Sequence, residues 1–132
     1  MKFSVLMSVY DGEKPEHLEQ ALDSIYTQSI RPSQFVLVED GTLNPLLRAV
    51  IDGFRERLPI VSLRLIQNVG LAEALNRGLN LCSEEIIFRA DSDDVNMHNR
   101  FRAQMDFMSS HNDITVLGGQ VDCFNSISEK II

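Results

Sequence analysis

The stretch that decides the fold of this chain is Glu85-Ile86-Ile87-Phe88-Arg89-Ala90-Asp91-Ser92-Asp93-Asp94. Its first part is an apolar run typical of a buried strand, and three carboxylates follow it within four positions. Carboxylates so close together repel one another, which costs stability unless a cation lies among them. Oxygen ligands of this kind suit a hard divalent ion such as Mg²⁺ or Mn²⁺. A solvated acidic turn is the alternative interpretation of these four residues.

Outward from this stretch, strands and helices alternate along the whole chain. Apolar runs predict strands at Phe3–Val9, Gln34–Val38, Ser62–Ile66, Glu85–Ala90 and Ile114–Leu117, and the start of another at Val121–Phe124. Helical spacing of apolar residues predicts helices that begin at Lys14-Pro15-Glu16, cover Leu46–Phe54 and Leu71–Leu81, and include Phe101–Met108. Strands joined by helical crossovers indicate a mostly parallel sheet with helices on both faces. The predicted fold class is therefore α/β.

Length and composition fit one compact domain, or half of a larger one. The chain has 132 residues, of which 44% are apolar, and a net charge of −7. That charge argues against a nucleic-acid backbone or an anionic membrane as the main partner. No stretch approaches the length of a transmembrane segment. Cys82 and Cys123 are too few for a disulfide framework or a zinc site, so we predict reduced thiols in a cytoplasmic protein.

Polar residues follow the first four predicted strands at the point where each ends. They are Ser8-Val9-Tyr10-Asp11, Glu39-Asp40-Gly41, Gln67-Asn68-Val69-Gly70 and the acidic cluster Asp91–Asp94. In open α/β sheets, ligands bind outside the carboxyl ends of the strands. Loops are often polar for no functional reason, but four such loops at one edge favour a ligand site.

A series of motifs runs along the chain: Phe3–Tyr10, Ala21–Ile25 with Gln28, Val36–Gly41, Asn68–Ala72 with Ala74–Leu79, and Arg89–Asp94 with Arg100-Phe101. With these motifs the chain resembles family 2 glycosyltransferases. The resemblance runs in the right order from about residue 3 to residue 119. It implies the GT-A fold, whose Rossmann-like half binds a nucleotide-diphospho-sugar and carries an Asp-x-Asp metal motif. The chain is similar in particular to bacterial enzymes that build exopolysaccharide, lipopolysaccharide or capsule, including amylovoran-type transferases.

The resemblance also implies roles for individual residues. Ser8 and Tyr10 are expected to touch the nucleotide, with Tyr10 stacking near the base. Asp40 is expected to accept a hydrogen bond from the base, usually uracil, while Asn68 and Asn76 line the nucleotide and the sugar. Asp91 and Asp93 are expected to hold a divalent metal (Mn²⁺ or Mg²⁺) and nearby sugar hydroxyls. The metal would bridge the two phosphates and stabilise the departing nucleoside diphosphate.

Three charged side chains have two possible roles each. Arg89 and Arg100 would either neutralise phosphate or pair with the neighbouring carboxylates, and we favour pairing. Glu13 would either reach the ribose or base, or be an acid favoured by the dipole at the start of a helix.

An inverting transferase needs a carboxylate base for the acceptor hydroxyl, and the sequence offers no candidate. The late acids Asp106, Asp113, Asp122 and Glu129 have the pattern of surface charges. We therefore expect residues 1–132 to be a single donor-binding domain, with no catalytic residue, from a truncated or longer enzyme. That enzyme would be a hexosyltransferase that acts on a saccharide or lipid-linked acceptor. The apolar edge left for the acceptor half also favours self-association into a homo-oligomer.

Three other classes of protein are alternatives to a glycosyltransferase. A receiver domain would carry paired acids after the first strand and a lysine after the fifth, and neither is present. A dinucleotide-binding Rossmann domain would carry Gly-x-Gly-x-x-Gly after the first strand, which is also missing. A non-catalytic module that binds a nucleotide-sugar would keep the same donor pocket, so the sequence does not separate it from an enzyme fragment.

Overall fold

The computed structural model describes residues 2–124 and 130–131. The chain groups into two compact units, Met1–Arg102 and Ala103–Ile132. The assignment of residues 1–132 to a single domain stays a prediction.

The first unit is built on a four-stranded sheet in which every pairing is parallel. The strands are β1 (Ser4–Val9), β2 (Gln34–Glu39), β3 (Ile60–Arg64) and β4 (Ile87–Arg89), in the order β3-β2-β1-β4. β1 and β2 lie in the middle and are almost completely buried, which explains their continuous apolar sequences. The predicted parallel α/β sheet is confirmed.

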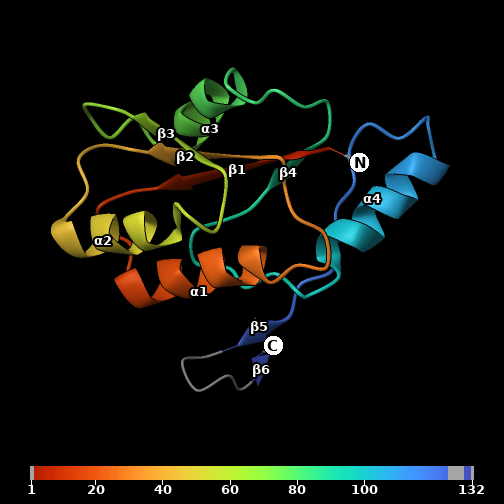
Figure 1. Ribbon diagram of the computed structural model, residues 1–132, viewed down its shortest axis with the longest axis horizontal. Helices are drawn as coiled ribbons and strands as arrows, with labels where there is room; N and C mark the ends of the chain where they lie inside the picture. Colours follow the sequence, from red (N-terminus) through yellow and green to blue (C-terminus); the bar gives the residue numbers. More distant parts are fainter. Residues whose placement is uncertain (1, 125–129, 132) are drawn as a thin grey trace. The chain divides into compact units, whose positions relative to one another are not determined.

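Helices cover both faces of this sheet (Figure 1). Helix α3 (Leu71–Leu79) packs on one face, against β1 and β2. Helices α1 (Pro15–Tyr26) and α2 (Pro45–Phe54) pack against each other and lie on the opposite face. A Cβ atom added at Gly78 would lie only 2.5 Å from Val38 Cγ2 and 2.6 Å from Leu6 Cδ1, so glycine is what lets α3 approach the sheet so closely.

Residues with a known preference for helix starts stand where the helices begin. Pro15 and Pro45 occupy the first turns of α1 and α2, where a missing N–H costs no hydrogen bond. Asn44 caps α2, because its side-chain oxygen accepts from the N–H groups of Leu46 and Leu47, both at 3.1 Å. Before α3 stands Gly70 with φ +93°, a conformation that favours glycine.

Three aromatic rings close the core beside the short edge strand β4. Phe3 lies 5.1 Å from Phe88 and 5.4 Å from Phe101, edge to face in both cases. All three rings are buried. They connect β4 to the residue range 100–102 at the start of α4 (Arg100–Ser110), so the segment after the acidic cluster is fixed to the core.

Element ends differ slightly from the predicted ones. β3 begins and ends two residues earlier than Ser62–Ile66, and Ile66 is 92% exposed. β4 keeps only the middle of Glu85–Ala90, and α3 ends at Leu79 rather than Leu81. Edge strands such as β3 and β4 pair on one side only, so their apolar pattern limits their ends less strictly.

In the second unit the predicted strand Ile114–Leu117 is wrong. That range is irregular, and Val116 is 86% exposed. Among the described residues of this unit, β5 (Cys123–Phe124) and β6 (Lys130–Ile131) are strands and pair antiparallel. The range predicted at Val121–Phe124 is thus a strand only in its last two residues. Within the residues that the structure describes, no helix is both long and apolar enough to cross a membrane.

Candidate functional site

The site lies at the carboxyl edge of the sheet, where the strand order reverses. The chain passes from β1 outward to β2 and β3, then returns to place β4 on the other side of β1. The loops after β1 and β4 therefore leave the sheet beside each other. In open α/β folds such a switch point is where the crevice for a ligand forms.

The loop after β1 presents the ring of Tyr10. This side chain is about half exposed, at 52%, although it is a large aromatic residue. The ring lies over Gly12, where an added Cβ would come within 2.4 Å of a ring carbon. Ser8 is partly buried on β1, level with Val38 of β2. The predicted nucleotide-contacting pair thus lies at the strand end, with an aromatic ring open to solvent.

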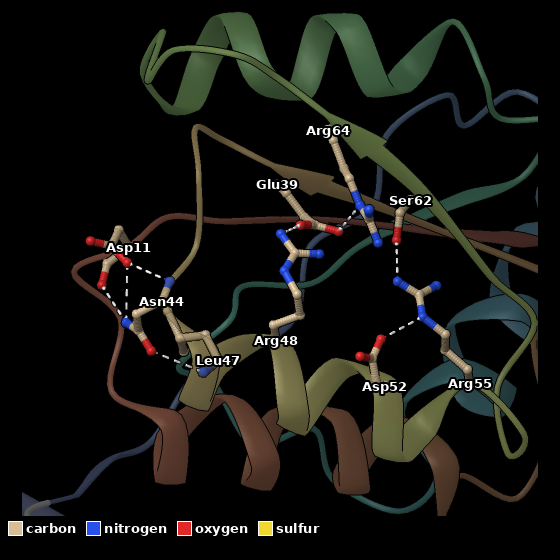
Figure 2. A network of polar contacts seen from close by, with 9 residues as sticks. All are labelled: Asp11, Glu39, Asn44, Leu47, Arg48, Asp52, Arg55, Ser62 and Arg64. Atoms are coloured by element: carbon tan, nitrogen blue, oxygen red, sulfur yellow. Dashed lines mark hydrogen bonds and ion pairs between the residues drawn. The ribbon is translucent and has the colours of Figure 1, made fainter.

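Asp11, in the same loop, fixes the start of α2 (Figure 2). Its Oδ1 accepts hydrogen bonds from Asn44 N at 2.7 Å and from Asn44 Nδ2 at 3.1 Å. Since Asn44 in turn caps α2, this contact ties the loop after β1 to the helix that follows β2.

Asp40 and Asn68, both expected to face the nucleotide, are hydrogen-bonded directly to each other. The Asp40 carboxylate is 4% exposed and accepts from Val69 N at 2.7 Å, Gly70 N at 3.1 Å and Asn68 Nδ2 at 3.2 Å. An added Cβ at Gly41 would lie 3.1 Å from Asn68 N, so the two loops approach closely. Asp40 therefore holds the segment that leads into α3.

The residue before it, Glu39, points to the α2 face and forms a buried ion-pair network (Figure 2). Its carboxylate is fully buried and lies 2.8 Å from Arg48 Nη2 and 3.3 Å from Arg64 Nε. Two guanidinium groups compensate the cost of burying this charge. The network fixes the end of β2 and thereby the position of Asp40.

The acidic cluster forms a turn in which Asp94 N donates to Asp91 O at 3.3 Å. Arg89 pairs with Asp91 at 3.3 Å, as favoured from the sequence. Partial burial, together with the charges of Asp91 and Asp93, raises the pKa of Asp94 above the ordinary value of a carboxyl group. The guanidinium of Arg100 opposes that rise, and burial lowers the pKa of Arg100 itself. Burial contributes more to the raised pKa of Asp94 than either neighbouring carboxylate does.

Sequence reasoning missed the contacts that hold the acidic loop in place. Ser92 Oγ donates to Glu13 Oε2 at 2.6 Å, across 79 positions of sequence. Further on, Asn96 N donates to Ser24 Oγ at 2.9 Å, and Gln28 Nε2 donates to Met97 O at 2.6 Å. The possible role of Glu13 in a ligand site was the only sequence signal for its contact with Ser92. The presence of polar Ser24 on the buried side of α1 was the signal for its contact with Asn96.

Asn76 is the one predicted site residue that lies within a helix. It is exposed in the second turn of α3. Among the late acids, Asp106, Asp113 and Asp122 are exposed, as expected of surface charges, and Glu129 lies outside the described residues.

A divalent ion fits the donor set, provided that a ligand completes it. In the described part of the chain no three His, Cys, Asp or Glu side chains are grouped to hold a metal by themselves. Mg²⁺ sites of nucleotide enzymes commonly use one or two carboxylates and complete the shell with water and substrate phosphates. Asp91, which is half-buried, and Asp93, which is exposed, could supply the one or two carboxylates of such a site.

Comparison with known proteins identifies the family of this chain. The model of "Glycosyl transferase family 2" matches residues 4–131. The chain belongs to this family. A UDP-Gal:alpha-D-GlcNAc-diphosphoundecaprenol beta-1,3-galactosyltransferase of Escherichia coli is 42% identical over 93% of the chain and 45% of its own length. The amylovoran biosynthesis glycosyltransferase AmsE of Erwinia amylovora is 41% identical over 90% of the chain, again 45% of its own length. The chain thus spans about half the length of these family 2 relatives.

Solved glycosyltransferase structures confirm the predicted GT-A fold. S. aureus TarS 1-349 in complex with UDP-GlcNAc superposes with a TM-score of 0.75 at 24% identity, covering 85% of this chain and 32% of that one. The mannosyltransferase PcManGT from Pyrobaculum calidifontis, in complex with GDP-Man and Mn²⁺, gives 0.60 at 23% identity, covering 70% and 27%. The family 2 resemblance stated from the sequence is confirmed as well.

Proposed function

We propose that this chain is the donor-binding part of a family 2 glycosyltransferase of surface polysaccharide synthesis, and that it binds a nucleotide-diphospho-sugar together with a divalent cation. The observation that carries the proposal is the acidic turn Asp91–Asp94 at the switch point of the sheet, beside the exposed ring of Tyr10. The acidic turn suits a diphosphate with its cation, and the exposed ring suits stacking on a planar base.

The donor is proposed to be a UDP-sugar. The name of the Escherichia coli relative includes UDP-Gal, and the TarS structure was solved with UDP-GlcNAc. Tyr10 would stack on the base, and Ser8, Asn68 and Asn76 would line the nucleotide and sugar. Three protein donors already use most of the roughly four acceptor positions of the Asp40 carboxylate. Asp40 would therefore add at most one hydrogen bond from the base.

Asp91 and Asp93 would hold the cation, either Mn²⁺ or Mg²⁺. The ion would supply charge neutralisation for the departing diphosphate. Arg89 would orient Asp91 through their ion pair, and Asp94 would contribute negative charge to the turn. Asp91 would also contact a sugar hydroxyl.

The acceptor of the whole enzyme is proposed to be a saccharide or a lipid-linked saccharide, and the reaction an inverting hexosyl transfer. The carboxylate base for the acceptor hydroxyl is proposed not to be among these residues, because the late acids that the structure describes are surface charges. The isolated chain should then bind donor without transferring sugar. Sugar transfer by this chain to an added acceptor would refute that part.

The decisive variant is Asp93→Ala, with Asp106→Ala as its control. Both remove one exposed carboxylate, but only the first belongs to the acidic turn. Calorimetric titration with UDP in Mn²⁺ should show affinity reduced by about tenfold or more for Asp93→Ala and unchanged for Asp106→Ala. Equal affinities for the two variants would show that the cluster is only a surface turn.

A further inference from the structure

We infer that Glu13 is a positioning residue, which holds the metal-binding turn in place through Ser92. The inference rests on the proposed function, since it concerns the same acidic turn. Glu13 belongs to the loop after β1 and Ser92 to the loop after β4, so their hydrogen bond crosses the switch point of the sheet.

The short distance and the burial of both side chains indicate a specific contact between Glu13 and Ser92. Its oxygen–oxygen distance of 2.6 Å lies in the range of a hydroxyl donating to a carboxylate. The side chain of Glu13 is only 10% exposed, and Ser92 is 8% exposed. The other carboxylate oxygen of Glu13 accepts from Lys14 N at 3.0 Å, at the start of α1. The carboxylate is thus held by a backbone N–H next to α1 as well as by the serine hydroxyl.

The turn has a second anchor four residues further on. There Asn96, buried like Ser92, is bound by Ser24 of α1. Asp93 and Asp94 lie between the two anchors and are exposed. Glu13 of the preceding loop and Ser24 of α1 therefore hold the two ends of the segment and leave the carboxylates between them facing solvent.

The Glu13–Ser92 contact orders the turn before any ligand binds. Ser92, a residue of the turn itself, donates a charge-assisted hydrogen bond to the Glu13 carboxylate, and hydrogen bonds of this type are stronger than those between neutral groups. Groups that orient metal ligands commonly affect metal affinity by about 10- to 100-fold when they are removed.

The test compares Glu13→Ala and Ser92→Ala with two controls. Glu13→Gln keeps an oxygen that accepts from the serine hydroxyl. Glu16→Ala removes an exposed acid from the first turn of α1, three residues further along the chain.

The first measurement is amide hydrogen exchange of the ligand-free chain. The N–H of Asp94 should exchange about tenfold faster in both Glu13→Ala and Ser92→Ala. It should exchange at the wild-type rate in Glu13→Gln and Glu16→Ala, and the amide of Val36 in the sheet should be unaffected in all four. Wild-type exchange at Asp94 in the two alanine variants would overturn the inference, whether or not UDP binds. If one alanine variant fails to fold, the other decides.

The second measurement is the affinity for UDP in the presence of Mn²⁺. Each alanine variant should bind at least about tenfold more weakly, and the double variant no more weakly than either, because both remove one contact. Losses that multiply in the double variant would contradict a shared contact. Failure of the wild-type chain to bind UDP would refute the proposed function, while hydrogen exchange would still decide the role of Glu13.

Discussion

Replacing Asp40 tests whether its carboxylate holds the loop that leads into α3. Asp40→Ala removes the acceptor of hydrogen bonds from Val69 N, Gly70 N and Asn68 Nδ2 at a site that is 4% exposed. Hydrogen bonds to a charged group contribute about 1.5–3 kcal/mol each, and three that share one carboxylate are not additive. We expect the free energy of unfolding to fall by about 3 kcal/mol or more, a large part of the total of about 5–15 kcal/mol.

Urea unfolding followed by circular dichroism measures this loss directly. Asp40→Asn should lose less, about 1–2 kcal/mol, because one amide oxygen still accepts from Val69 N while its NH₂ group faces another donor. Asp23→Ala, which removes an exposed acid of α1, should change stability by less than about 0.5 kcal/mol. If Asp40→Ala unfolds at the urea concentration of the wild type with the same slope, the carboxylate does not hold this loop.

Two further substitutions test the packing of α3 and the electrostatics of the acidic turn. Gly78→Ala should destabilise the chain by about 1–3 kcal/mol, because the new methyl group would overlap Val38 and Leu6. Gly53→Ala in α2, where no atom lies within 4 Å, should instead stabilise it by about 0.5–1 kcal/mol, and thermal unfolding of both variants checks the contrast. Asp94→Asn should raise the melting temperature of the metal-free chain at neutral pH, since the raised pKa means that the fold disfavours the charged form. The gain should shrink as pH falls through that raised pKa, where the native carboxyl takes up its proton, and a gain that is constant with pH would exclude repulsion as its cause.

The sheet and its helices could be predicted because their signals are local. The continuous apolar runs of β1 and β2 reflect burial on both sides, and the spacing of Leu18, Leu22 and Ile25 in α1 reflects one buried face. The strand expected at Ile114–Leu117 fails for a non-local reason. Strand-forming residues need a partner strand, and this range pairs with none in the part of the chain that the structure describes.

The candidate site, like the fold, could be predicted from the sequence only in part. The strand-end position of Tyr10, Asp40 and Asp91 follows from the order of elements alone. The contact between Glu13 and Ser92 joins residues 79 positions apart, so no local pattern reveals it. The three bonds to Asp40 likewise depend on how closely two loops approach, which the sequence does not specify.

The most direct test of the central claim is a calorimetric titration of the wild-type chain with UDP, once in Mn²⁺ and once in EDTA. We predict saturable binding in Mn²⁺ that is weakened by about tenfold or more in EDTA, because Asp91 and Asp93 repel the diphosphate when no cation lies between them. Absence of binding in both conditions, or equal binding in both, would contradict a cation-dependent donor site at this edge of the sheet.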